Sequence, residues 1–330
     1  MKTDVLALLQ ESDGQFLSGQ AMSQKLGITR AAVWKQIKRL RETGYEIEAV
    51  TNLGYRLISA PDALDREKIL EFLGPEHPWR DTVHVVMSTD STNNLAKREA
   101  LSGAPHGSVF LADEQTGGRG RPGRSFASPR GVGVYLSVLL RPDLQPTQLG
   151  HATAMVAVAG CNAVETVTGL RPSIKWTNDL ILGERKLSGI LTEMSAEWES
   201  GALEYLVMGI GINCNHRDED FPEDVRKKAV SLRQTLGKPI DRNHLAAALI
   251  EELYKLSLDI ANGKQQWIAQ YARDCITIGR QVKIIRGDNI RLAEATGIDE
   301  NGALLVRYDT GETGVVFTGE VSVRGINGYI

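Results

Sequence analysis

The sequence predicts a multidomain α+β protein, and three changes of pattern along its 330 residues predict where it divides. The N-terminal part combines two short helical patterns with a basic stretch. The middle part alternates strand and helix patterns, which is typical of a domain with its own mixed sheet. The C-terminal part holds short strand patterns separated by turn signals. We expect domains over residues 1–61, 65–274 and 275–330.

The composition is that of an ordinary globular protein, with 42% hydrophobic and 24% charged residues. No apolar run approaches the ~20 residues that a membrane helix needs, so we expect no membrane partner. The N-terminus lacks the apolar core of a signal peptide. Cys161, Cys214 and Cys275 lie far apart and show neither metal spacing nor a disulfide framework. These features predict a cytoplasmic protein.

A helix-turn-helix is expected near the N-terminus. Ser18 is a candidate N-cap, Gly27 a candidate helix end, and Thr29 the N-cap of the next helix. The second helix places apolar residues at helical spacing, which predicts a buried stripe. The stripe consists of Val33, Ile37 and Leu40. Residues 45–50 and 54–57 then alternate around a turn, as a β-hairpin would, and predict the wing of a winged helix.

The second of these helices is basic. Residues 25–41 contain six basic residues and no acidic one, which favours binding to DNA phosphates. The alternative is a solvated helix pair that binds only protein. The candidate DNA-contacting residues are Ser18, Thr29, Arg30, Trp34, Lys35, Lys38 and Arg39.

The middle part predicts strands over residues 82–87, 109–112, 132–140 and 203–212. It predicts helices over residues 91–101, 148–168 and 241–261, the last of which closes the domain. Beyond residue 278 the expected strands are 281–286, 290–298, 303–308, 312–317 and 320–324. Short strands with this spacing predict a small β-barrel or sandwich.

Residues 116–124 are the most distinctive segment, and we call them the arginine loop. They read Thr-Gly-Gly-Arg-Gly-Arg-Pro-Gly-Arg. Glycine lets backbone approach a ligand closely, and arginine offers a planar fork of donors to phosphate or carboxylate. The loop is therefore suited to wrap a small anion. The alternative is a solvated basic turn.

The arginine loop matches the glycine spacing of a dinucleotide-binding fingerprint, but its context does not. That fingerprint needs a helix that opens at the third glycine, and the residues after Gly123 cannot form one. No Lys-Ser/Thr pair stands at P-loop spacing either. We therefore expect arginine side chains, rather than a helix N-terminus, to meet the anion.

A second chemical cluster covers residues 175–193. Lys186 lies on a predicted hairpin with Gly183 in its turn. A lysine on such a strand either points to solvent or turns inward, where it would neutralise a developing negative charge. Asp179 is either a metal or ribose ligand or a turn-capping residue. Spacing alone leaves both choices open.

Four segments together resemble the successive motifs of biotin–protein ligases. They are residues 91–93 (Ser-Thr-Asn), 115–124, 175–193 and 209–213 (Gly-Ile-Gly-Ile-Asn). With the predicted winged helix, the chain is similar in motif order to the family branch that is both biotin ligase and biotin operon repressor. The resemblance implies a central domain like that of class II aminoacyl-tRNA synthetases and a C-terminal SH3-like barrel.

The resemblance also implies a reaction and partners. Biotin and ATP, with Mg²⁺, would form biotinyl-5′-AMP, and the biotinyl group would pass to a lysine of biotin carboxyl carrier protein or another biotin-dependent carboxylase acceptor domain. With biotinyl-5′-AMP bound, the protein would form a homodimer on operator DNA and repress the biotin operon. Two alternatives are a biotin-sensing regulator without ligase activity and a lipoate ligase.

The resemblance assigns roles to residues of this chain. The implied catalytic residues are Lys186, Arg119 and Arg121. The implied biotin-binding residues are Ser91, Thr92, Asn93, Gln115, Gly118, Arg119, Arg121, Lys186, Gly189 and Leu191. The implied nucleotide-binding residues are Arg121, Arg124, Phe126, Lys186, Asn213 and Asp179. No metal ligand is assigned.

Two positions depart from the family pattern. Phe126 stands where the family often has tryptophan, and it keeps an aromatic face for adenine with less area. Pro122 replaces a commoner polar residue and should restrict the backbone there. We expect the arginine loop to be disordered without ligand, because its glycines make ordering entropically costly.

Overall fold

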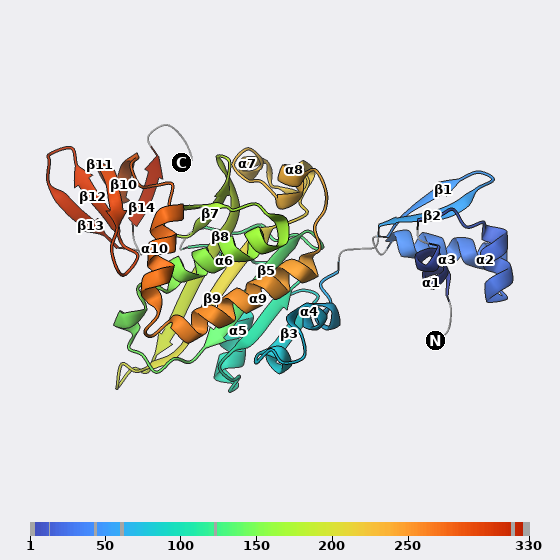
Figure 1. Ribbon diagram of the computed structural model, residues 1–330, viewed down its shortest axis with the longest axis horizontal. Coiled ribbons are helices and arrows are strands. Elements are labelled where there is room, and N and C mark those ends of the chain that lie inside the picture. Colours follow the sequence, from blue (N-terminus) through green and yellow to red (C-terminus); the bar gives the residue numbers. More distant parts are fainter. Residues whose placement is uncertain are drawn as a thin grey trace. The chain divides into compact units, whose positions relative to one another are not determined.

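The computed structural model of the chain describes residues 4–12, 14–42, 45–59, 63–121, 124–317 and 321–325 (Figure 1). The chain forms two compact units, Met1–Ala63 and Leu64–Ile330. Of the predicted linker at residues 59–62, the last three residues lie outside the described part. In the described part, no helix has both the length and the apolar character needed to cross a bilayer.

The first unit is a three-helix domain with a β-hairpin. Its elements are α1 (Val5–Glu11), α2 (Gly19–Leu26), α3 (Arg30–Glu42), β1 (Glu46–Val50) and β2 (Gly54–Ser59). The three predicted helix ends are confirmed: Ser18 accepts from the Ala21 N–H, Gly27 adopts a left-handed conformation, and Thr29 Oγ1 accepts from the Ala32 N–H. Helix α1 was not predicted.

The predicted stripe of α3 forms the core of this unit. Val33 and Ile37 are buried against Val5 and Leu9 of α1, and Leu40 is partly buried beside them. Strands β1 and β2 pair antiparallel, as expected for a wing. Arg41 donates to the Ile47 carbonyl and thereby ties the end of α3 to β1.

The second unit contains a seven-stranded mixed sheet in the order β3-β4-β5-β9-β8-β7-β6. Strands β3 and β4 are parallel, and the other neighbours are antiparallel. The strands are β3 (Val83–Val86), β4 (Ser108–Ala112), β5 (Gly133–Leu140), β6 (Ser173–Lys175), β7 (Asp179–Leu182), β8 (Arg185–Ala196) and β9 (Leu203–Asn213).

Helices cover both faces of this sheet. Val109 and Leu111 of β4 pack in the core with α6 (Ala152–Thr168) and α9 (Arg242–Asp259), while Phe110 between them packs with α5 (Thr92–Leu101) on the opposite face. Figure 1 shows α6 and α9 lying side by side across the sheet. The remaining helices are α4 (Arg66–Leu73), α7 (Glu223–Arg226), α8 (Leu232–Leu236) and α10 (Lys264–Asp274), with 3₁₀ turns at Arg80–Thr82, Pro146–Leu149 and Asp218–Asp220.

Two expectations about helices in this unit were wrong. The helix predicted from residue 148 begins at Ala152, because the Gln148 side chain accepts from the Gln145 N–H and closes a separate 3₁₀ turn. The helix predicted to close the domain is followed by α10, which packs against α6. Its amphipathic pattern was overlooked, although Trp267, Ile268 and Tyr271 are buried at helical spacing.

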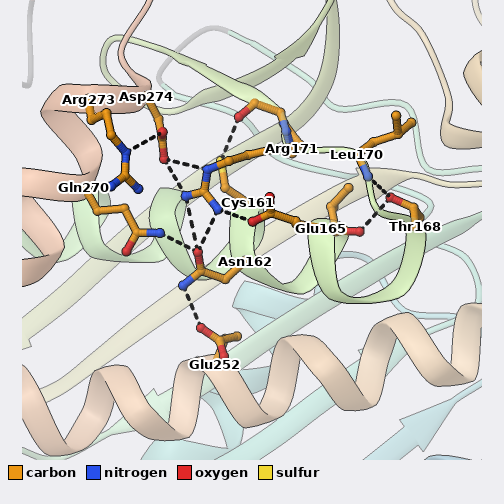
Figure 2. Close-up of polar contacts among 12 residues, drawn as sticks. Cys161, Asn162, Glu165, Thr168, Leu170, Arg171, Glu252, Gln270, Arg273 and Asp274 are labelled. Atoms are coloured by element: carbon orange, nitrogen blue, oxygen red, sulfur yellow. Dashed lines mark hydrogen bonds and ion pairs between the residues drawn. The ribbon is translucent and has the colours of Figure 1, made fainter.

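A polar cluster joins α6, α9 and α10 to the chain that enters β6 (Figure 2). Arg171 donates to Asp274 at the end of α10 and to Glu165 and Asn162 of α6. Asn162 in turn donates to Glu252 of α9. Charge-assisted hydrogen bonds offset the cost of partly burying these charges, so the cluster fixes where the chain enters β6, the edge strand of the sheet.

The last part of the second unit is a five-stranded antiparallel sheet in the order β13-β12-β11-β10-β14. Its strands are β10 (Gln281–Arg286), β11 (Asn289–Ile298), β12 (Leu304–Tyr308), β13 (Thr313–Val316) and β14 (Val321–Gly325). Alternate residues such as Val282, Ile284 and Val306 are buried in the same core as the larger sheet. The predicted strand at residues 320–324 begins at Val321, and residue 320 lies outside the described part. The predicted α+β organisation is confirmed.

Candidate functional site

Two adjoining cavities lie on the sheet face that carries α5, beneath the arginine loop. The polar cavity is lined by Ser91, Thr92, Asn93, Gln115, Arg119, Phe126, Gly189, Leu191, Gly209, Ile210 and Gly211. The cationic cavity is lined by Arg119, Gly120, Arg121, Arg124, Ser125, Phe126, Asn178, Asp179, Lys186, Gly189 and Ile190. They share Arg119, Phe126 and Gly189, so one elongated ligand can occupy both.

Glycines in β8 and β9 make the floor of the site. Gly211 pairs with Gly189 across the two strands. A Cβ on Gly211 would lie 2.6 Å from Cε1 of Phe126, so only glycine lets that ring rest on the sheet. A Cβ on Gly209 would lie 1.9 Å from Oδ1 of Asn93. The sheet therefore carries glycines, which have no side chain, where α5 and the segment after the arginine loop pack closely on it.

Hydrogen bonds hold the polar cavity in shape. The Thr92 N–H and hydroxyl both donate to Gln115 Oε1, at 2.8 and 3.2 Å. Gln115 Nε2 donates to Ser128 Oγ at 2.7 Å, so the amide orientation is determined on both sides. Ser137 Oγ, fully buried on β5, donates to Asn93 Oδ1 at 2.7 Å. Preorganised amides of this kind can recognise a neutral polar ligand group such as a urea.

Glu193 on β8 joins the polar cavity to the arginine loop. Its carboxylate accepts from Asn93 Nδ2 at 2.9 Å, from Lys97 Nζ at 2.9 Å and from Arg119 Nη1 at 3.0 and 3.1 Å. Burial opposes ionisation, but these hydrogen bonds and the charges of Lys97 and Arg119 outweigh it and lower the pKa of Glu193. The carboxylate is therefore charged at neutral pH.

Lys186 turns inward, which answers the question left open by the sequence. Its Nζ lies 2.6 Å from Asp179 Oδ1 and 6.0 Å from the centre of the Phe126 ring. The main chain of Lys186 is held as well: its N–H donates to the Lys228 carbonyl, and its carbonyl accepts from the Val230 N–H. Asp179 is almost buried and lies at the start of β7 rather than in an exposed turn.

The described part of the arginine loop folds back on itself. The Gly120 N–H donates to the Arg124 carbonyl at 3.0 Å, and the Phe126 N–H donates to the Gly118 carbonyl at 2.9 Å. Pro122 and Gly123 lie outside the described residues, so the expected restriction at Pro122 lies there too. The expected disorder of the loop stays a prediction.

Two predicted site residues, Gly118 and Asn213, do not line the cavities. Gly118 lines neither cavity. A Cβ at this position would lie 2.2 Å from the carbonyl oxygen of Phe126, so glycine lets the two arms of the loop approach each other. Asn213 lines neither of them, and its Nδ2 donates to the carbonyls of Lys186 and Val230. Ser91 lines the polar cavity from the N-cap position of α5.

The residues of this arrangement that were not predicted include Glu193, Lys97, Ser137 and Ser128. Strand alternation could have identified Glu193, because residues 189, 191 and 193 share one face of β8. Ser137 is a polar residue in an otherwise apolar buried strand, which was a second available signal. Lys97 follows Asn93 by one helical turn. The described residues contain no group of three or more His, Cys, Asp or Glu that could hold a metal ion.

The candidate DNA-binding face lies on the first unit. Arg30, Lys35 and Arg39 of α3 are exposed, and Trp34 is 57% exposed with Lys38 Nζ 5.9 Å from its ring centre. Ser18 and Thr29 cap α2 and α3 through their hydroxyls. The face is therefore a basic helix surface with one aromatic ring, suited to phosphate contacts.

Family models match most of the chain. The model described as an HTH domain matches residues 2–56, the one described as Biotin/lipoate A/B protein ligase family matches residues 85–213, and the one described as Biotin protein ligase C terminal domain matches residues 277–324.

Known proteins are similar along nearly the whole chain. The bifunctional ligase/repressor BirA of Bacillus subtilis is 36% identical and covers 94% of this chain and 95% of its own. The bifunctional ligase/repressor BirA of Escherichia coli is 32% identical, and the similarity covers 97% of this chain and 96% of that protein. Among solved structures, the biotin protein ligase from Aquifex aeolicus in complex with biotin and ATP has a TM-score of 0.63 and 27% identity, and covers 74% of this chain and 99% of its own.

Proposed function

The chain belongs to the biotin/lipoate A/B protein ligase family, and we propose that it is a biotin–protein ligase that also represses a biotin operon. The observation that carries this proposal is the pair of adjoining cavities, one polar and one cationic, joined at Arg119. Biotin has a neutral ureido end and an anionic carboxylate end, and ATP adds further negative charge. The three predicted domains, at residues 1–61, 65–274 and 275–330, would separate DNA binding from catalysis.

The first step joins biotin to ATP. A biotin carboxylate oxygen attacks the α-phosphorus, the bond to the β-phosphate oxygen breaks, and pyrophosphate leaves. The product is biotinyl-5′-AMP, a mixed anhydride. Because reactants and transition state are all anionic, the protein must align the two groups and supply positive charge. The arginines and Lys186 at the cationic cavity do both.

The polar cavity is the proposed place of the biotin rings. Thr92, Asn93 and Gln115 offer amide and hydroxyl groups whose orientation the hydrogen-bond network determines. Ser91, Gly189 and Leu191 complete the wall, and Gly118 lets the loop pack closely above it. Arg119 and Arg121 would hold the carboxylate at the boundary between the cavities.

The cationic cavity is the proposed place of the adenylate. Lys186 would exchange its contact with Asp179 for the carboxylate and α-phosphate oxygens. Arg121 and Arg124 would contact phosphates, and Phe126 would offer a ring to adenine. Asn213 acts here by holding the main chain of Lys186 through its carbonyl. Its amide nitrogen is engaged by two carbonyls, so its proposed role toward the nucleotide is indirect.

The second step transfers the biotinyl group. The neutral amine of an acceptor lysine attacks the anhydride carbonyl, the bond between that carbonyl carbon and the phosphate oxygen breaks, and AMP leaves as the amine loses a proton. Asp179 lies 2.6 Å from Lys186 Nζ, and this carboxylate would orient the attacking amine or accept its proton. The proposed acceptor is biotin carboxyl carrier protein or another biotin-dependent carboxylase domain.

Mg²⁺ fits this site as a companion of ATP. Among the described residues that line the cationic cavity, Asp179 is the one carboxylate, and Mg²⁺ is commonly held by one or two carboxylates together with substrate phosphates. Asp179 is therefore its proposed protein ligand. When bound, Mg²⁺ would neutralise charge on the phosphates.

Repression would use the first unit. The exposed basic residues of α3 are proposed to bind operator DNA, mainly through phosphates. A homodimer with biotinyl-5′-AMP bound is the proposed DNA-binding form. In its support, the edge of β8 that faces away from β9 has no strand partner beyond Ile190 within the described residues. Such an edge can pair with a second copy of the chain.

The test incubates the protein with ATP, radiolabelled biotin and a biotin carboxyl carrier domain. The proposal expects ATP-dependent label on one acceptor lysine. Binding of biotin without transfer of label would leave a biotin-sensing regulator. Transfer of lipoate in preference to biotin would identify a lipoate ligase. Either outcome would overturn the ligase proposal.

A further inference from the structure

Glu193 stands out because a carboxylate next to a site for carboxylates and phosphates should repel its ligand. It is nevertheless charged and accepts hydrogen bonds from three side chains. Lys97 offsets one negative charge, so Glu193, Lys97 and Arg119 together keep a net positive charge. A like charge retained at this place needs a compensating role.

The hydrogen bonds of Arg119 show what that role is. Nη1 donates to Asn94 Oδ1 at 2.8 Å and to both oxygens of Glu193, which uses its two hydrogens. Within the described residues, Nε and the other terminal nitrogen of Arg119 make no hydrogen bond. Those two nitrogens form one edge of the guanidinium fork, the edge that can bind a carboxylate through two parallel hydrogen bonds.

We propose that Glu193 is a positioning residue that holds one end of the Arg119 guanidinium, so that the opposite edge faces the cavity and reads the carboxylate of biotin. The inference rests on the proposed function. Its second support is that Glu193 also accepts from Asn93, on the polar wall of the same cavity. One side chain therefore sets the spacing between the group for the ureido end and the group for the carboxylate end.

Two opposite expectations separate this role from simple electrostatics. If Glu193 acted only through its charge, its replacement by neutral glutamine would strengthen biotin binding, because a like charge would be removed. If it positions Arg119, the same change weakens biotin binding. The Glu193→Gln variant keeps the shape of the side chain and one of its two oxygens. It removes the charge and replaces the other oxygen by an NH₂ group, which cannot accept a hydrogen bond from Arg119.

The experiment measures dissociation constants for biotin and for biotinol, in which an alcohol replaces the carboxylate. The Glu193→Gln variant is expected to bind biotin about tenfold more weakly, the usual loss for one charge-assisted hydrogen bond, with unchanged affinity for biotinol. In an Arg119→Met background, the Glu193→Gln change should add nothing for biotin. Glu199→Gln, an exposed carboxylate on the same hairpin, is the matched control and should behave as wild type.

Each other outcome overturns the inference. Tighter biotin binding by Glu193→Gln would leave only a charge effect. Equal losses for biotin and biotinol would make Glu193 a structural support of the polar cavity. An undiminished effect in the Arg119→Met background would show that it acts elsewhere. Failure of the wild-type protein to bind biotin at all would instead refute the proposed function.

Discussion

At the scale of single residues, the site depends on side chains that hold other side chains. Lys186 is held by Asp179, Arg119 by Glu193 and Asn94, and Gln115 by Ser128. The sequence motifs contained the residues proposed to touch ligand, since those types are chemically distinctive. Their holders were harder to find, because a serine or glutamate acquires that role only through its neighbours in space.

The charge of Lys186 should matter most for the first chemical step. We expect Lys186→Met to slow formation of biotinyl-5′-AMP by about 10²–10³-fold. The variant lacks the positive charge that is positioned to stabilise the negative charge developing on the α-phosphate. The measurement is single-turnover release of pyrophosphate. Lys238→Met, which removes an exposed lysine, is the control. An unchanged adenylation rate in Lys186→Met would remove Lys186 from the catalytic set.

His216 should make stability depend on pH. Burial, aided by the charge of Arg242, lowers the pKa of His216 to about 4. In the unfolded chain an ordinary histidine has a pKa of about 6.5. Between these values the unfolded state binds more protons, so stability falls as pH falls from 6.5 towards 4, by about 2 kcal/mol at pH 5.

Chemical unfolding at pH 7 and pH 5 checks this contribution. His216→Phe keeps a ring to stack on Phe221 but cannot titrate, so its loss of stability between the two pH values should be smaller than that of the wild type by about 2 kcal/mol. Identical pH dependence in both proteins would show that His216 is not the group responsible.

At the scale of elements, the structure depends on where the helices begin and on the polar cluster that joins them around Arg171. Capping residues identified both ends of α2 and the start of α3 from sequence, because those contacts are local in the chain. The start of α6 was missed, because Gln148 belongs to the turn before it. The polar cluster around Arg171 joins residues far apart in sequence, so no local pattern in the sequence predicts it (Figure 2).

Loss of the hydrogen bonds that Arg171 donates in the polar cluster should destabilise the second unit. We expect Arg171→Met to lower the free energy of unfolding by about 2 kcal/mol, because the nearly buried Asp274 loses its charge-assisted hydrogen bonds. Arg273→Met is the matched control, because the Arg273 side chain is 68% exposed and its Nε lies 3.5 Å from Asp274 Oδ1. Its change should stay below about 0.5 kcal/mol. Equal effects in denaturant titrations would contradict this account.

The basic surface of α3 should act through phosphates. We expect Lys35→Gln to weaken operator binding and to reduce the slope of log affinity against log salt by about 1, the value for one lost phosphate contact. Filter binding or anisotropy over a range of salt concentrations measures both. Lys68→Gln makes the same charge change on α4 of the second unit. A salt slope unchanged by Lys35→Gln would place DNA elsewhere.

At the scale of the whole molecule, ligand is proposed to couple catalysis to repression. Biotinyl-5′-AMP can change dimerisation only by binding one state of the protein better than another. The arginine loop is the candidate for that difference, because it lines the site and its glycines make ordering costly.

Limited proteolysis tests the loop directly. We expect trypsin to cleave after Arg119 and Arg124 in the free protein and several times more slowly with biotinyl-5′-AMP. The bond after Arg121 is followed by Pro122 and resists trypsin. Sedimentation of the same samples should show that the protected form is the dimeric one. Equal cleavage with and without ligand would contradict ordering of the loop, and protection without a change in mass would separate loop ordering from dimerisation.

The α+β plan, the winged helix, the chemistry of the arginine loop and the family resemblance could all be predicted from the amino-acid sequence. These follow from periodicity, capping and motifs, all of which are local in the chain. Three features became visible only in the folded chain: Lys186 turns inward, Phe126 rests on glycines of β8 and β9, and Glu193 accepts hydrogen bonds from Arg119. Those contacts join strands and loops distant in sequence, and their energy depends on burial and geometry that no local pattern contains.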